Sequence, residues 1–351
     1  MSAPVLLAGS PSTDLLAELA VRAARIGDDV AGALRLAAEL GATSTAPGTG
    51  RTLHRWSTLA TLGAADLTAS RVVEPHLDAL AILAEAADAG LDVPLGAVGA
   101  DRTSTWGVFA AEGPGLALQA TESDHGWVLS GTKPWCSLAD RLTHALITAR
   151  TPEGRGLFAV ALRSDRIQVL PGTWVARGLA RVPSGPIVID AAPAVPVGLP
   201  RWYLERPGFA WGGIGVAAVW FGGAVGIARK LLDHAAATPE DPLRLMALGA
   251  VDTALTGAAA ALAASATAID TGAMPAGEAG VLASRVRGVV AAAVELTLTR
   301  AGHTLGPAAL ALDEEHARRV ADLTLYVRQH HAERDDLALG TQLVKRGTRP
   351  W

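Results

Sequence analysis

The feature that most constrains the fold is a block of short apolar runs between two long helical regions. From about residue 101 to 198, runs such as "GWVLSGT", "LTHALITAR" and "GLFAVAL" are separated by Gly, Pro, Ser and Asp at intervals of roughly ten residues. Parallel strands joined by helices need longer connections, which excludes a Rossmann unit. The spacing predicts a small antiparallel β-domain.

Helical periodicity surrounds this block. Apolar residues recur at three- and four-residue spacing from about 12 to 95, and longer helical segments follow at 208–236, 241–270, 277–302 and 314–337. Long helices with short connections predict a bundle. The predicted fold class is therefore α+β, in three domains: an N-terminal α-helical domain (1–100), a middle antiparallel β-domain (101–200) and a C-terminal four-helix bundle (201–351).

Composition excludes several classes of protein. Half of the 351 residues are hydrophobic and 18% are charged, which argues against disorder. The formal net charge of −4 gives no broad attraction to nucleic acid or to an anionic membrane surface, so we expect neither as a partner. The single cysteine, Cys136, excludes an internal disulfide framework and a cysteine-built metal site. The first residues lack the basic segment of a signal peptide, so we expect a cytoplasmic protein.

Two apolar stretches are long enough to span a bilayer, 207–228 and 246–269. Both are rich in Gly and Ala, which contribute little to membrane transfer but allow helices to pack closely. We therefore expect bundle helices or a subunit interface here, and no membrane span.

Three segments, in this order, resemble the acyl-CoA dehydrogenase flavoprotein family. They are "WGVFAAEGPG" (106–115), "GWVLSGTKPWCSLADRLTHALITAR" (126–150) and "ARRVADLTLYVRQHH" (317–331). The resemblance covers nearly the whole chain. It implies FAD held between a helical domain, a β-domain and a four-helix bundle, in a homodimer or homotetramer. The implied activity is α,β-dehydrogenation of an acyl thioester such as an acyl-CoA, with hydride transfer to flavin N5.

The resemblance assigns flavin contacts to the loop that holds the cysteine. It implies that Trp135 packs against the isoalloxazine ring and that Ser137 hydrogen-bonds near N5. In an extended segment these two side chains share one face and Cys136 takes the other, so we expect Cys136 to be a small apolar filler.

The remaining cofactor assignments depart from the family pattern. The resemblance implies that the loop holding Phe109, Ala111 and Glu112 binds the pyrimidine edge of the flavin, although Ala111 replaces a Thr or Ser of the family. Arg244, in "PLRLMALG", approximates the arginine that grips the pyrophosphate. Arg300 lies in the segment whose family counterpart meets a neighbouring subunit's FAD.

The catalytic base departs most. Many family members place a glutamate, in a Glu-Gly-Thr word, eight residues after the aspartate that matches Asp322; here that position is His330. Histidine can act as a general base near neutral pH, and histidine near this position is more familiar in the family's monooxygenase branch. Glu295 is an alternative base. Two further functions stay open: a flavin-dependent monooxygenase of the same fold, and a non-catalytic structural member.

The segment "HHAE" (330–333) lacks the geometry of a metal-binding site. His330 and His331 are adjacent, so their side chains diverge on a helix, and no second cluster completes a site with Glu333. We therefore expect no metal. The identity of the small-molecule substrate stays open.

Overall fold

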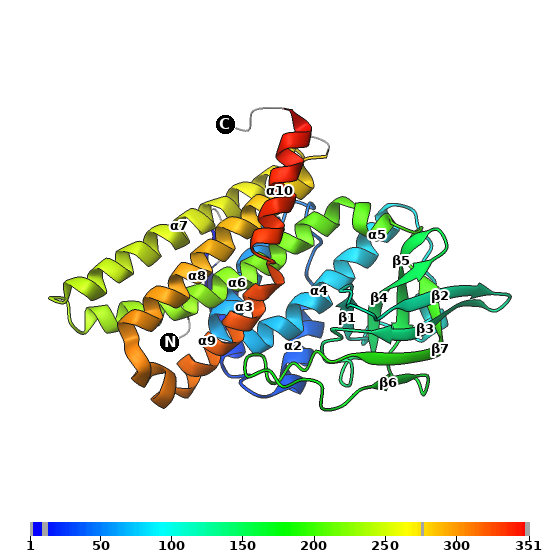
Figure 1. Cartoon of the computed structure of the whole chain (residues 1–351), viewed down its shortest axis with the longest axis horizontal. Helices are drawn as coiled ribbons and strands as arrows, with labels where there is room; N and C mark the ends of the chain where they lie inside the picture. Colours follow the sequence, from blue (N-terminus) through cyan, green and yellow to red (C-terminus); the bar gives the residue numbers. More distant parts are fainter. Residues whose placement is uncertain (1–2, 9–12, 275–276, 348–351) are drawn as a thin grey trace.

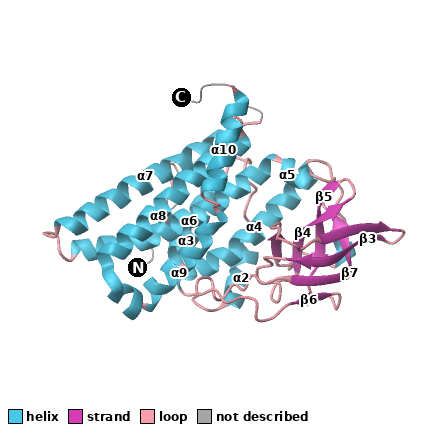
Figure 2. Ribbon diagram, in the orientation of Figure 1, coloured by secondary structure: helices cyan, strands magenta, loops and turns pink. Residues whose placement is uncertain are grey.

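Helices form one end of the molecule and strands gather at the other (Figures 1 and 2). The computed structural model describes residues 3–8, 13–274 and 277–347. Helices, then strands, then helices follow one another in the predicted order, which confirms the α+β class.

The N-terminal helices pack directly on the bundle. In the described part of the chain they are α1 (Thr13–Ala24), α2 (Val30–Gly41), α3 (Thr52–Ala65) and α4 (Leu67–Asp88), followed by the 3₁₀ turn η1 (Leu95–Val98). α3 is buried along nearly its whole length because α6 (Pro207–Ala236) lies against it. The two backbones are so close that a Cβ at Gly63 or Gly222 would collide with a carbonyl oxygen of the opposite helix.

The sheet closes into a small barrel. Its strands are β1 (Trp106–Phe109), β2 (Leu118–Ser123), β3 (Gly126–Lys133), β4 (His144–Thr151), β5 (Gly154–Ala161), β6 (Ile167–Val169) and β7 (Ile187–Pro196). They are ordered β1-β4-β2-β3-β7-β5, β6 pairs with β7, and β5 also pairs with β4. Most pairs are antiparallel as predicted, but β1 and β2 each pair with β4 in parallel. The β2–β3 hairpin lies between β1 and β4 in the chain, which lets β4 return in the direction of β1.

The bundle follows a short helix, α5 (Trp202–Glu205), and consists of α6, α7 (Pro242–Asp270), α8 (Ala279–Leu312) and α9 (Glu314–Tyr326). α8 continues past the predicted end and is kinked at Gly306, whose φ of 69° and ψ of −173° are not helical. The helix predicted over 314–337 is interrupted. α9 ends at Tyr326, a 3₁₀ turn η2 (Val327–Gln329) follows, and α10 begins only at Glu333 and ends at Arg346.

Among the described residues, α6 and α7 have the length and apolar composition needed to cross a membrane. In α6, 61% of the most apolar window is buried inside the protein, as befits the central helix of the bundle. In α7 only 22% of that window is buried, so a single chain leaves most of its apolar surface open.

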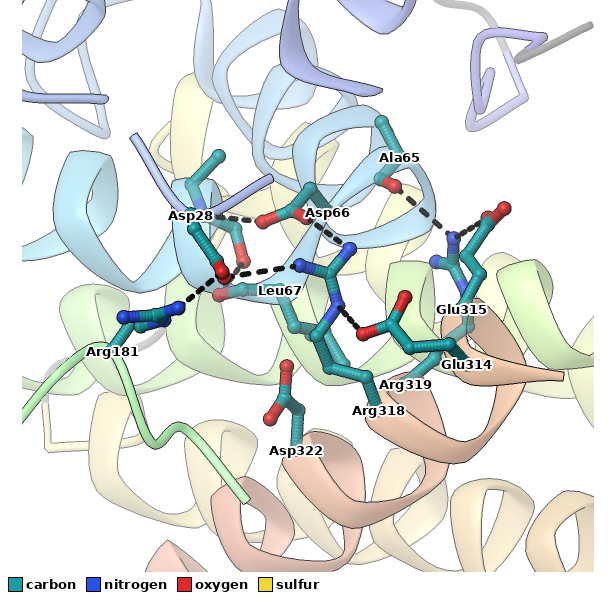
Figure 3. A network of polar contacts seen from close by, with 12 residues as sticks. Asp28, Ala65, Asp66, Leu67, Arg181, Glu314, Glu315, Arg318, Arg319 and Asp322 are labelled. Atoms are coloured by element: carbon teal, nitrogen blue, oxygen red, sulfur yellow. Dashed lines mark hydrogen bonds and ion pairs between the residues drawn. The ribbon is translucent and has the colours of Figure 1, made fainter. Parts of the chain in front are cut away.

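The first turns of α9 connect three parts of the chain (Figure 3). Arg318 lies 3.3 Å from the Asp66 carboxylate at the α3–α4 junction and 3.7 Å from that of Asp28, between α1 and α2. Asp322 Oδ1 accepts the Leu179 N–H at 2.5 Å, in the loop between β6 and β7. Burial raises the pKa of Asp322 to about 6. This segment, which resembles the family's Arg-Asp-Ala helix, docks α9 onto the other two regions.

Candidate functional site

The loop after β3 turns sharply where an extended segment was predicted. Trp135 and Leu138 have left-handed backbones, with φ of 60° and 55°. The predicted strand-like alternation is therefore wrong, because the chain changes direction at each of these residues. Trp135 is nevertheless 56% exposed, whereas Ser137 is buried at 8%.

Cys136 is buried in the hydrophobic core and 1% exposed. Burial raises the pKa of its thiol, so the thiol stays protonated and unreactive at neutral pH. The prediction that Cys136 is an apolar filler is confirmed.

Ser137 joins three segments through its hydroxyl group. Arg71 Nη2, from α4, donates to Ser137 Oγ at 3.0 Å. Ser184 Oγ, from the loop before β7, lies 2.7 Å from the same oxygen and itself donates to the Val182 carbonyl at 3.1 Å. The hydroxyl is thus fixed by the helical region and by the barrel.

Behind Ser137 lies a buried cluster of polar side chains. Arg71 Nη1 is 3.8 Å from Glu74 Oε2, and the Arg71 guanidinium stands over the Tyr326 ring at 5.5 Å. The Tyr326 hydroxyl donates to Glu74 Oε2 at 3.4 Å. Burial raises the pKa of Glu74 to about 7, against the nearby positive charge of Arg71, which lowers it. Glu74 can therefore gain or lose a proton near neutral pH.

The loop after β1 lies against the loop after β3. Phe109 is buried at 2%, whereas Ala111 and Glu112 are exposed. A Cβ at Gly113 would touch the Pro134 ring, which shows how closely the two loops approach. The structure thus brings Ala111 and Glu112 beside the segment that carries Trp135 and Ser137.

Glu112 is held in place by cations of the barrel. Its carboxylate lies 3.4 Å from Lys133 Nζ, 3.4 Å from Arg155 Nη2 and 3.6 Å from Arg150 Nη2. Lys133 also donates to the Thr148 carbonyl at 2.9 Å, and burial lowers its pKa to about 8. These contacts give Glu112 a role in fixing the loop.

The exposed ring of Trp135 offers an aromatic surface to a ligand. The small pocket lined by Arg71, Trp106, Phe109 and Ser137 measures about 10 Å³, enough for one water molecule and far too small for a ring system. A large, half-exposed aromatic side chain beside a buried hydroxyl is instead suited to an aromatic group stacked from outside.

Arg287 of α8 shapes the turn before His330. It donates to the Gly213 carbonyl at 2.9 Å and to the Gln329 carbonyl at 2.8 Å, and its guanidinium stands 4.7 Å above the Trp220 ring. The turn η2 is thereby attached to α6.

Both ring nitrogens of His330 have neighbours. Nδ1 accepts the Ala332 N–H at 3.3 Å, which places the proton of the neutral ring on Nε2, 3.8 Å from the Asp335 carboxylate. Burial lowers the pKa of His330, so the ring is neutral at pH 7. To act as a base in this geometry, Nδ1 would first have to release Ala332.

The other predicted residues are placed outside the Ser137 cluster. Arg244 pairs with Asp241 at 3.1 Å near the start of α7, and the α6–α7 turn lies at the end of the molecule opposite the strands (Figure 1). Arg300 lies on α8, and its buried Nε has no partner among the described residues. Glu295 forms an ion pair with Arg328 and is about half exposed.

Comparisons with known proteins rest on structure alone. No protein-family model matches the chain, and no curated protein matches its sequence significantly. KijD3 in complex with FMN and a dTDP-amino-sugar matches with a TM-score of 0.80 at 18% identity, over 98% of this chain and 97% of that chain. The dibenzothiophene monooxygenase TdsC from Paenibacillus sp. A11-2 matches with a TM-score of 0.69 at 16% identity, over 93% and 97%. The FAD complex of PigA matches with a TM-score of 0.73 at 14% identity, over 96% and 99%.

The chain has the acyl-CoA dehydrogenase-like fold. At these identities the likeness establishes the fold alone, and the fold class assigned from the sequence is confirmed.

Within the acyl-CoA dehydrogenase-like fold, sequence reasoning missed Arg71 and Glu74. Their signal was present: Arg71, Glu74, Asp78 and Glu85 follow helical spacing, so α4 carries them on one face among apolar residues. Charged groups in a row on a helix that is otherwise apolar must be paired inside the protein.

Proposed function

We propose that the chain is a flavin-dependent oxidoreductase of the monooxygenase type. The observation that carries the proposal is the setting of Ser137, held by Arg71 at 3.0 Å beside the half-exposed ring of Trp135. A bound flavin supplies electron transfer to a substrate or, once reduced, to dioxygen. Trp135 would cover one face of the ring, and Ser137 would donate a hydrogen bond to its edge.

The similar structures support a flavin cofactor. KijD3 is described with FMN, PigA with FAD, and TdsC as a dibenzothiophene monooxygenase. All three match more than nine-tenths of this chain. The name of TdsC supports oxygenation ahead of acyl-CoA dehydrogenation.

The geometry of the candidate bases also favours oxygenation. Dehydrogenation of an acyl thioester needs a free base to remove the α-proton. Glu295 is engaged by Arg328, and His330 Nδ1 is engaged by the Ala332 N–H. An oxygenase needs no carboxylate at either position.

We propose flavin as the cofactor on contacts that FMN and FAD share. Trp135 and Ser137 would contact only the ring, whereas Arg244, the residue expected to bind a pyrophosphate, is paired with Asp241, the N-cap of its own helix. Purified protein should be yellow. Extraction and chromatography of the bound flavin then identify FMN or FAD, and a colourless protein that ignores both flavins would support a non-catalytic family member instead.

Oxygenation is tested with the reduced, flavin-loaded protein and ¹⁸O₂. Indole, dibenzothiophene and dTDP-amino-sugars are suitable probes because similar enzymes are described with them. Incorporation of ¹⁸O into a probe supports the proposal. Anaerobic bleaching of the oxidised flavin by acyl-CoA esters, without oxygenation of any probe, would establish a dehydrogenase instead.

His330 stays the proposed base, and to act as one its Nδ1 must first release the Ala332 N–H. His330→Ala should lower turnover at least tenfold, and His125→Ala, at an exposed histidine in the β2–β3 turn, serves as the control. Equal turnover in both variants would remove His330 from the mechanism.

We infer that a second copy of the chain covers α7. Leu243, Leu245 and Met246 at its start are 69%, 46% and 60% exposed, which is costly for an isolated protein. Sedimentation should show a dimer or tetramer, and Met246→Glu should shift the population toward the monomer.

A further inference from the structure

Arg71 lies between a neutral and an acidic partner. Nη2 donates to Ser137 Oγ at 3.0 Å, while Nη1 faces Glu74 Oε2 at 3.8 Å. Both side chains of the ion pair are largely buried, at 14% and 10% exposure. Water therefore screens neither contact well, and the charge state of Glu74 affects Arg71 strongly.

Ser137 becomes free to act as a donor to a ligand when Ser184 changes its own hydrogen bond. Its oxygen accepts from Arg71, and Ser184 Oγ lies at 2.7 Å, where either hydroxyl can donate. When Ser184 turns its proton from the Val182 carbonyl to Ser137, the Ser137 oxygen accepts twice. The Ser137 proton is then available to an acceptor on a bound ligand.

Charged or ionisable groups from four helices surround Glu74. They are Arg71 and Asp78 on α4, Arg55 on α3, Tyr326 on α9 and Arg287 on α8. Burial raises the pKa of Glu74 to about 7 in this setting. The proton on Glu74 is therefore in exchange where the protein works, while the arginines stay charged.

We propose that Arg71 is a positioning residue that makes Ser137 a charge-assisted hydrogen-bond donor to the flavin, and that the proton on Glu74 sets the strength of this donor. This inference rests on the proposed flavin site. With Glu74 protonated, the positive charge of Arg71 is uncompensated and polarises the Ser137 hydroxyl. With Glu74 ionised, the pair is neutral and the donor is weaker.

The consequence is a pH-dependent flavin potential. Reduction adds negative charge to the ring, and a stronger donor at Ser137 stabilises that charge and raises the potential. Below the pKa of Glu74, wild-type protein and Glu74→Gln present the same neutral side chain and should have similar potentials. Above it, only the wild type neutralises Arg71, so Glu74→Gln should have the higher potential.

The experiment is a spectroelectrochemical titration of the flavin-loaded protein between pH 6 and 8.5. We expect Arg71→Gln to lower the potential by about 30 mV, the shift of a tenfold change in a two-electron equilibrium. Arg71→Lys keeps the positive charge and serves as a second variant should Arg71→Gln fold poorly. Its flavin potential should lie between those of the wild type and Arg71→Gln. Arg35→Gln and Glu39→Gln remove exposed charges of the same kinds and should leave the potential unchanged.

The outcomes distinguish the role of Arg71 and Glu74 from the presence of a flavin site. A Glu74→Gln potential that exceeds the wild-type value only at high pH supports the inference. Flavin bound normally with the same potential in Arg71→Gln, Glu74→Gln and wild type overturns it and leaves the flavin site standing. A wild-type protein that takes up neither FMN nor FAD overturns both.

Discussion

Asp322 Oδ1 accepts the Leu179 N–H at 2.5 Å, which fixes the β6–β7 loop to α9. The same loop carries Ser184, whose hydroxyl lies 2.7 Å from that of Ser137. The bundle thus acts through the β6–β7 loop on the position of a residue in the candidate flavin site. Tight docking of this kind depends on a small residue at the contact.

Gly178 supplies that small residue. A Cβ at this position would collide with the Ala321 carbonyl of α9, so Gly178→Ala must displace the loop or the helix. We expect a loss of about 1–3 kcal/mol in the free energy of unfolding, together with weaker flavin binding. Urea denaturation and flavin fluorescence measure the two effects. Gly96→Ala, which meets no atom within 4 Å, is the control, and equal stability of the two variants would contradict the docking.

Trp135 should strengthen flavin binding, although its backbone conformation is strained. Its φ of 60° costs a residue with a side chain about 1 kcal/mol, so Trp135→Gly should be about 1 kcal/mol more stable than Trp135→Ala. Both variants lose the ring and should bind flavin equally poorly, whereas Trp135→Phe should retain part of the affinity. At Val175, which is 84% exposed and has no positive φ, the Gly variant should be the less stable of the two.

Cys136 should be silent chemically. The thiol is 1% exposed and its pKa is raised by burial, so native protein should not react with Ellman's reagent, while urea-unfolded protein should release one equivalent per chain. Cys136→Ser buries an extra polar group and should be less stable than Cys136→Ala by about 1–3 kcal/mol. Rapid labelling of the folded protein would contradict this account.

The parts of the fold that could be predicted are those specified by local sequence. The helices predicted at 208–236 and 241–270 lie at Pro207–Ala236 and Pro242–Asp270, because apolar spacing within one helix defines its buried face. The break after Tyr326 was missed because the following polar residues still permit a helix. Only tertiary packing shows where the chain must turn: α9 packs against α4, α6 and α8, whereas α10 packs mainly against α8.

The candidate site could be predicted only on its barrel side. Trp135 and Ser137 stand in one recognisable segment, whereas Arg71 reaches Ser137 from 66 positions earlier in the chain. No local pattern encodes such a pairing. The left-handed turn at Trp135 was also hidden, because Gly or Asn usually marks such a conformation and neither is present there.

Glu74 should give the folded protein a measurable pH dependence of stability. Its pKa rises from an ordinary 4.5 to about 7 on folding, so the folded chain holds a proton that the unfolded chain releases. The stabilisation is complete below pH 4.5 and is lost as the pH rises through 7, because in this range the native state binds more protons than the unfolded state. Glu74→Gln lacks this loss. Relative to the wild type, its free energy of unfolding should therefore rise by about 2–3 kcal/mol between pH 5 and 8.

Glu39→Gln, at an exposed carboxylate, should follow the wild type across the same range, and urea denaturation at each pH makes the comparison. Parallel curves for Glu74→Gln and wild type would show that the buried carboxyl is ionised throughout.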